Sequence, residues 1–363
     1  MTQSSITGGR LTAAQITSVL ALAEAAEAAD GVAPLSEHTL LHLRYDDREP
    51  DPGPARERYS EPTSEHANFR MKQRDAVLAV GGQIVGYAHL DSDALSMDLS
   101  GELVIHPGHR RRGLGLALVR ELTAEADGHP VRLWAHGDLP AANRLARAAG
   151  FDRFRALWQM RRSLRDPVEA PRFPPGSILR TFRPGRDEND WLSLNSRAFA
   201  GHPEQGAWTR HDLELRELEP WFDPAGFFIA ERDGAMAGFH WTKIHGPAAE
   251  PGSVGEVYVV GVDPGERGTG LGRALTLAGL HYLRDRGLAR AILYVDEDNV
   301  PAVRMYEALG FTRTRTDAMY RRAGLSGGYF SGKRTRKTPD PPTLAEMPSP
   351  DPLAPRPAGP SAG

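Results

Sequence analysis

The stretch that decides the fold is residues 254–275, which read VGEVYVVGVDPGERGTGLGRAL. Its first part is rich in β-branched residues, which predicts a strand over 254–262. A glycine-rich loop follows, and apolar residues from 271 onward recur at helical spacing. In such a strand–loop–helix, glycines let the backbone approach a ligand closely, and free N–H groups at the helix start attract an anion. We therefore expect a pyrophosphate-binding loop, with Arg267 adding positive charge.

The same pattern occurs earlier in the chain. Residues 110–118 read RRRGLGLAL, and residues 267–275 read RGTGLGRAL, 157 positions later. A second pair of similar segments, 141–151 and 301–311, lies 160 positions apart. Two pairs at nearly one offset indicate a duplicated unit of about 155–160 residues, a period too long for a solenoid.

The apolar patterns of the second repeat alternate between strand and helix periods. A turn at Asp233 and Gly234 joins the first two strands. The first repeat follows the same order from 75 to 161, after helical patterns at 11–29 and 35–44. This predicts an α+β fold, a mostly antiparallel sheet layered by helices. The elements expected in the second repeat are strands at 226–231, 236–242, 254–262, 291–295 and 311–321, and helices at 271–286 and 299–309.

Proline-rich stretches mark the expected domain boundaries. Residues 166–177 are rich in proline and predict a stiff, solvated linker. Nine of the 33 residues from 331 to 363 are proline, which predicts a disordered tail over 326–363. The domains are then 1–165 and 178–325.

The overall composition narrows the classes of function. Lys and Arg (44) nearly balance Asp and Glu (47), which disfavours nucleic acid and anionic membranes as partners. The chain has no Cys, so disulfides and thiol nucleophiles are excluded. No apolar run is long enough to span a bilayer, and the N-terminus does not resemble a secretory signal. The 13 His show no paired ligand spacing, so we expect no metal. We expect a cytoplasmic monomer.

Other glycine motifs fit the loop less well. A dinucleotide fold would place its glycines after a first parallel strand, and a triphosphate loop would need Gly-Lys-Ser/Thr. The pattern Arg-x-x-Gly-x-Gly, followed by the Asn299 to Phe311 segment, instead resembles the GNAT family of acyl-CoA-dependent N-acetyltransferases. Five further segments resemble the mycothiol synthase branch of that family, whose members carry two GNAT domains. They are VGVDP (260–264), LTLAGL (275–280), LYVDEDN (293–299), HPEQG (202–206) and LSEH (35–38).

This resemblance covers about residues 10–322 and implies acetyl transfer from acetyl-CoA to the cysteinyl amine of desacetylmycothiol. Amide formation from a thioester needs a base for the amine and an acid for the departing thiolate. Glu256 is the candidate base, or else an edge-strand Glu facing water. Tyr306 is the candidate acid, or else a core aromatic residue. Asn299 could flank the cofactor, cap a helix, or do both.

The resemblance also implies two groups of binding residues. The candidate residues for the acceptor are Glu37, Glu204, Lys243, Glu256 and Tyr294. The candidate residues for acetyl-CoA are Leu103, Val104, Ile105, Arg111, Arg112, Gly113, Leu114, Gly115 and Leu116 in the first repeat, and Val260, Gly261, Val262, Arg267, Gly268, Thr269, Gly270, Leu271, Gly272, Arg273, Asn299, Val300, Pro301, Ala302, Val303 and Arg304 in the second.

The two repeats are expected to differ in chemistry. Aligned on their loops and Gly-Phe motifs, the sequences place Ala146 opposite Tyr306 and Leu99 opposite Glu256, with Glu102 three positions away. We therefore expect the first repeat to bind acetyl-CoA without catalysing transfer. Two alternatives remain: a GNAT enzyme that acetylates an aminoglycoside or a peptide N-terminus, and a non-catalytic acyl-CoA sensor.

Overall fold

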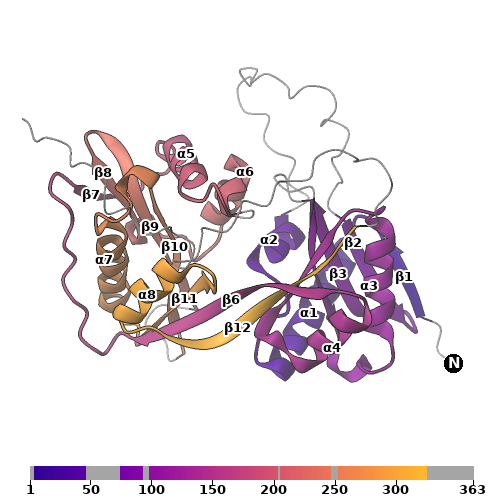
Figure 1. The fold of residues 1–363 in the computed structure, drawn as a ribbon. Coiled ribbons are helices and arrows are strands. Elements are labelled where there is room, and N and C mark those ends of the chain that lie inside the picture. Colours follow the sequence, from indigo (N-terminus) through magenta and orange to yellow (C-terminus); the bar gives the residue numbers. More distant parts are fainter. Residues whose placement is uncertain (1–3, 46–73, 93–97, 203–204, 247–251, 325–363) are drawn as a thin grey trace, which may run out of the picture. The chain divides into compact units, whose positions relative to one another are not determined.

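The structure is a computed structural model, and it describes residues 4–45, 74–92, 98–202, 205–246 and 252–324 (Figure 1). All of them lie within one compact unit. The predicted tail at 326–363 lies outside the described residues. Among the helices of the described segments, none is long and apolar enough to cross a membrane.

Two runs of elements follow one another in the same order, as the duplication predicts. The first run is β1 (Ser4–Gly8), α1 (Ala13–Asp30), α2 (Glu37–Tyr45), β2 (Arg74–Val80), β3 (Gln83–Ser92), β4 (Leu99–Ile105), α3 (Leu114–Glu125), β5 (Val131–Ala135), α4 (Pro140–Ala148) and β6 (Asp152–Ser163). The second run is β7 (Ile178–Thr181), α5 (Glu188–Ala198), α6 (Arg210–Glu217), β8 (Phe227–Arg232), β9 (Ala235–His245), β10 (Val254–Val262), α7 (Leu271–Asp285), β11 (Arg290–Asp296), α8 (Val300–Ala308) and β12 (Thr312–Arg322).

The strands of both runs form a single mixed sheet in the order β1-β2-β3-β4-β5-β12-β6-β11-β10-β9-β8-β7. The order is palindromic when each strand of the first run is matched with its counterpart in the second. The final strands are exchanged, because β12 pairs with β5 and β6 pairs with β11. Figure 1 shows β6 and β12 running side by side, and they pair antiparallel with each other.

Helices cover both faces of the sheet and bury separate apolar clusters. In the first run, α3 packs Leu118 and Leu122 with Leu78 of β2, whereas α1 packs Val19 and Leu22 with Val77. Neighbouring residues of one strand point to opposite faces, so α1 and α3 lie on opposite sides. The second run repeats this arrangement: α5 lies over a cluster of aromatic residues that includes Trp241, and α7 packs on the other face.

The α+β class and the predicted order of elements are confirmed, but the pairing of the repeats needs one correction. Strand β10 carries a bulge between Val257 and Val259, which inserts Tyr258 into its pairing with β9. No such shift occurs in the pairing of β4 with β3. Because of this extra residue, the counterpart of Glu256 is Ser100 and not Leu99: Glu256 pairs with Ile292, as Ser100 pairs with Arg132.

The predicted linker is not uniformly solvated. Val168 is buried in an apolar cluster with Leu164 and Leu288. Glu169 also contacts α7, through an ion pair with Arg273 at 2.8 Å. The segment between β6 and β7 is therefore packed against the second run at these residues.

Candidate active site

A cleft of about 1040 Å³ is lined by residues of both runs. Four of the five predicted acceptor-binding residues share it: Glu37 from α2, Lys243 from β9, Glu256 from β10 and Tyr294 from β11. The fifth, Glu204, lies outside the described residues. Four residues that lie far apart in the sequence thus line one cleft.

Glu37 begins α2 and joins it to the second run. One of its carboxylate oxygens pairs with the Lys243 ammonium, and the other accepts a hydrogen bond from the Tyr258 hydroxyl at 2.5 Å. Burial alone raises the pKa of Glu37, but the charges of Lys243 and Arg216 outweigh that effect and lower it. Lys243 also lies 4.4 Å from the centre of the Trp221 ring, a cation–π contact.

Glu256 lies inside the sheet and is only 6% exposed, so the alternative of an edge-strand residue facing water is wrong. Its Cα pairs with that of Lys243 on one side and that of Ile292 on the other. Its carboxylate lies 2.5 Å from Nε2 of His245, two residues beyond Lys243 on β9. Since alternate strand residues share a face, Lys243, His245 and Glu256 all face the same side.

Tyr294 contributes a hydroxyl from β11. Gln159 and Arg315 each donate a hydrogen bond to it, at 2.8 and 3.0 Å. Burial, and then the negative charge of Glu256, raise the pKa of Tyr294. The phenol thus stays neutral and can hydrogen-bond to a polar ligand beside Glu256.

A partly buried histidine lines the cleft from the first run. His136 lies 3.0 Å from a Glu102 oxygen and 3.4 Å from an oxygen of Asp317, a β12 residue. Burial lowers the pKa of His136, but the two carboxylates outweigh it and raise the pKa to about 10. Glu102 also accepts the backbone N–H of Ser36 at 2.7 Å, next to Glu37. The group therefore fixes the start of α2.

The glycine-rich loop before α7 has the expected geometry. Gly268 and Gly270 adopt φ of 81° and 90°, and α7 begins without a side-chain cap on its first turn. Strand β10 pairs with β11 only at residues 255–257, so its edge beyond Val257 has no β11 partner. That edge can pair with an extended ligand. A Cβ on Gly261, which lies on this edge, would be only 2.4 Å from the Phe239 ring, so glycine fits there and a larger residue does not.

Arg267 and Arg273 already have partners in this structure. Arg267 donates to the carbonyl of Ala198 at 3.0 Å, and Arg273 pairs with Glu169. The predicted acetyl-CoA residues of the second run line neither the cleft nor a further cavity, which lies in the first run.

Tyr306 and Asn299 sit on and before α8. Tyr306 is 8% exposed and packs edge-on against Phe311, in an apolar cluster with Val257. Burial raises the pKa of its phenol to about 12, so it keeps its proton at neutral pH. The carboxamide of Asn299 accepts the N–H of Ala302 at 3.3 Å and caps α8, so the capping alternative is confirmed.

The first run holds a second cavity, of about 530 Å³, at its own loop. Ala146 lines it where the second run has the bulky Tyr306. Of the nine acetyl-CoA residues predicted in this run, all but Arg112 line the cavity. They are Leu103, Val104, Ile105, Arg111, Gly113, Leu114, Gly115 and Leu116.

Comparisons with known proteins agree with this architecture. The Acetyltransferase (GNAT) family matches residues 189–311, and the Acetyltransferase (GNAT) domain matches residues 73–153. Mycothiol acetyltransferase of Thermobispora bispora is 58% identical over 305 residues, covering 84% of this chain and 95% of the relative. Mycothiol acetyltransferase of Thermomonospora curvata is 55% identical over 311 residues, covering 85% and 94%. The chain belongs to the mycothiol acetyltransferase family.

Solved structures share the fold of this family member at lower sequence identity. A tandem GNAT protein from the clavulanic acid biosynthesis pathway has a TM-score of 0.63 and 22% identity, covering 88% of this chain and 98% of its own. A GCN5-related N-acetyltransferase from Sphaerobacter thermophilus has a TM-score of 0.58 and 23% identity, covering 87% and 95%.

Sequence reasoning missed several residues that line the cleft of this mycothiol acetyltransferase family member. His245 could have been found, because strand alternation places it on the same face as Lys243. Tyr258 could not, because it faces the cleft only through the bulge. Arg315 and Asp317 reach the cleft through the exchange of β12, which has no signal in the sequence pattern.

Proposed function

We propose that this chain transfers the acetyl group of acetyl-CoA to the cysteinyl amine of desacetylmycothiol, giving the amide mycothiol and free CoA. One observation carries the proposal: the buried Glu256 is paired with the exposed His245 in the wall of a cleft that also presents Glu37, Lys243 and Tyr294. A pseudo-disaccharide acceptor needs such converging polar groups, whereas a peptide acceptor needs an extended groove.

The proposed reaction assigns one task to each group. Glu256 takes the proton that the amine loses as its nitrogen attacks the thioester carbonyl, and His245 hydrogen-bonds to Glu256 and orients it. Backbone N–H groups of β10 beyond Val257 stabilise the oxyanion. Tyr306 donates its phenolic proton to the sulfur as the carbon–sulfur bond breaks. The acetyl group passes directly between substrates, because the chain has no cysteine to hold it.

The two loops take the acetyl-CoA pyrophosphate, each at a helix N-terminus. In the second run, residues 260–262 and 299–304 flank the pantetheine arm next to Glu256. In the first run, the cavity beside Ala146 also takes acetyl-CoA. The counterparts of Glu256 and Tyr306 there are Ser100 and Ala146, which can act neither as a base nor as an acid. We propose further that the first run belongs to a domain that spans residues 1–165, and the second run to a domain that spans residues 178–325.

The test is to mix the purified protein with acetyl-CoA and one amine at a time, and to follow the release of free CoA. Desacetylmycothiol should release CoA faster than an aminoglycoside or a peptide does. Equal rates with all three amines would show that the acceptor is wrong. Acetyl-CoA binding without CoA release from any amine would favour the sensor alternative.

The role of Glu37 can be tested with the same assay. Glu37→Gln keeps the shape of the side chain but removes the charge that faces Lys243. Hydrogen bonds to charged groups contribute about 1.5–3 kcal/mol, so KM for the acceptor should rise at least about tenfold. KM for acetyl-CoA should not change. Glu24→Gln, an exposed change on α1, is the matched control.

A further inference from the structure

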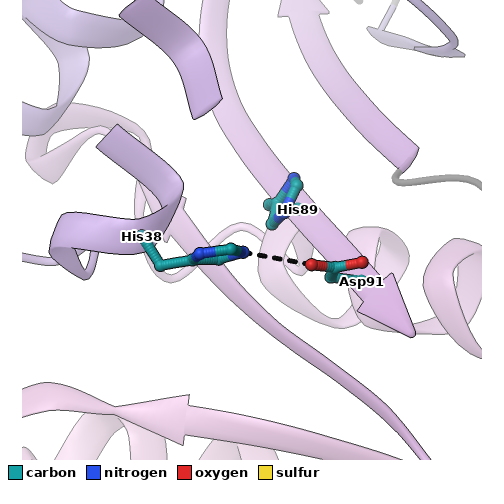
Figure 2. A group of neighbouring side chains, drawn as sticks. All are labelled: His38, His89 and Asp91. Atoms are coloured by element: carbon teal, nitrogen blue, oxygen red, sulfur yellow. Dashed lines mark hydrogen bonds and ion pairs between the residues drawn. The ribbon is translucent and has the colours of Figure 1, made fainter. Parts of the chain in front are cut away.

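A second cluster of titratable side chains lies in the first run, apart from the residues that line the cleft. Figure 2 shows His38 of α2 beside His89 and Asp91 of β3. His38 Nε2 lies 3.0 Å from an Asp91 oxygen. Each of the three residues offers a ligand atom, and these atoms all lie within 4.8 Å of one another.

His89 has a polar atom that the fold leaves unsatisfied. The side chain is 2% exposed, and its Nδ1 lies 3.0 Å from an Asp75 oxygen. The other ring nitrogen, Nε2, is buried and has no hydrogen-bond partner among the described residues. An unsatisfied buried polar atom costs free energy, so it calls for an explanation.

The surroundings of His89 resemble those of a metal-binding histidine. Such a residue usually donates one ring N–H to a carboxylate, which leaves the other nitrogen free to bind the ion. Asp75 provides that carboxylate, and the Tyr87 hydroxyl (2.6 Å) and His42 (3.1 Å) hold it in place. In the alternative group, His42 and His89 both hydrogen-bond to Asp75, so that its ligand atoms are already satisfied. The group of His38, His89 and Asp91 differs because it includes the unpartnered Nε2 of His89, although His38 hydrogen-bonds to Asp91 there.

We propose that His38, His89 and Asp91 bind a divalent transition-metal ion of the zinc class. Imidazole and carboxylate are ligands that zinc accepts, and three protein ligands leave a fourth position for water. Neighbouring ligand atoms around tetrahedral zinc lie about 3.4 Å apart. The side chain of His38, 46% exposed, can move the remaining distance, and the same exposure gives the ion a route of entry.

The ion would link α2 to β3. His38 follows Glu37 directly, so the link would hold the helical turn that presents Glu37 to the acceptor. This inference does not depend on the proposed acetyl transfer, because a structural ion is detected by binding and by stability alone.

The test uses the full chain without a histidine tag, after treatment with a chelator. Zinc is titrated in competition with a chromogenic chelator, and cobalt is added separately to report the ligand geometry by its visible absorption. We expect one zinc ion per chain, a cobalt spectrum typical of a tetrahedral or five-coordinate site, and a rise in the thermal unfolding midpoint when zinc is added. His38→Ala should weaken zinc binding at least about tenfold and remove the rise.

Controls separate this site from surface histidines and from misfolding. His211→Ala removes an exposed histidine of α6 and should bind zinc as the wild type does. Asp91→Asn should weaken binding while its zinc-free thermal midpoint stays close to that of the wild type. The proposal is overturned if the wild type binds no zinc, if His38→Ala binds it with wild-type affinity, or if His211→Ala loses it equally.

Discussion

At the scale of single residues, substitution of Tyr306 tests the proposed proton transfer to the departing thiolate most directly. Tyr306→Phe keeps the ring against Phe311 and removes only the hydroxyl. If that hydroxyl protonates the departing thiolate, kcat should fall by about 10²–10⁴-fold, while the thermal midpoint changes little. Tyr282→Phe on α7 removes a partly buried hydroxyl bonded to Asp223 and should leave kcat nearly unchanged. Full turnover by Tyr306→Phe would rule out the assigned acid.

His136 gives the molecule a pH-dependent stability. Its pKa is about 10 in the folded chain and about 6.5 in an unfolded one. A raised folded-state pKa stabilises the fold fully below about pH 6.5, and the stabilisation is lost as pH rises towards 10. The thermal midpoint of His136→Gln should therefore fall furthest below the wild type near pH 6 and approach it near pH 10. If the two thermal midpoints differ by the same amount at every pH in this range, the raised pKa of His136 is contradicted. His211→Gln, at an exposed position, is the control.

At the scale of elements, the loops before α3 and α7 can be compared directly. Gly115 and Gly272 sit in the first turns of these helices with ordinary φ. A Cβ would lie 3.2 Å from Leu145 at Gly115 and 3.4 Å from Val262 at Gly272, so the Leu145 side chain must shift slightly in the first case. An Asp there repels a pyrophosphate. Gly272→Asp should abolish turnover. Gly115→Asp should lower acetyl-CoA binding from two molecules per chain to one, measured by titration calorimetry. Two molecules still bound to Gly115→Asp would place the second one elsewhere.

Most of these elements are predictable because their signals are local. The strand over 254–262 matches β10 from end to end, and Asn299 marks the start of α8. The short β7 and the helices α5 and α6 were not predicted, since their apolar residues do not keep a clean period. In the candidate site, four residues named from the sequence line one cleft: Glu37, Lys243, Glu256 and Tyr294. His245 was missed although strand alternation from Lys243 indicates its face, whereas Tyr258 could not be predicted because it faces the cleft only through the bulge in β10.

At the scale of the whole molecule, the exchange of β6 and β12 could not be predicted. Either repeat could keep its own last strand with the same alternation of side chains, so the sequence pattern does not distinguish the two pairings. The exchange predicts cooperative unfolding. A chain that ends at residue 311 lacks β12, and β5 then loses its partner in the other repeat.

That truncation should reduce amide-hydrogen protection in β4 and β5 as well as in β6 and β11. A chain that ends at residue 324 keeps β12 and should retain full protection. Normal protection of β5 in the shorter chain would show that the repeats fold independently. Hydrogen exchange read by mass spectrometry reports each strand separately.

The palindromic sheet makes this chain the covalent counterpart of a strand-swapped homodimer. In a true homodimer, every substitution appears in both copies, so both sites must change together. A fused chain has no such constraint, and Tyr306 and Ala146 already differ at equivalent positions. The fusion also lets one cleft contain Glu37 from one half and Glu256 from the other without a second cleft related to it by a two-fold rotation. A single chain can therefore encode two halves with different sites, which a dimer of identical subunits cannot.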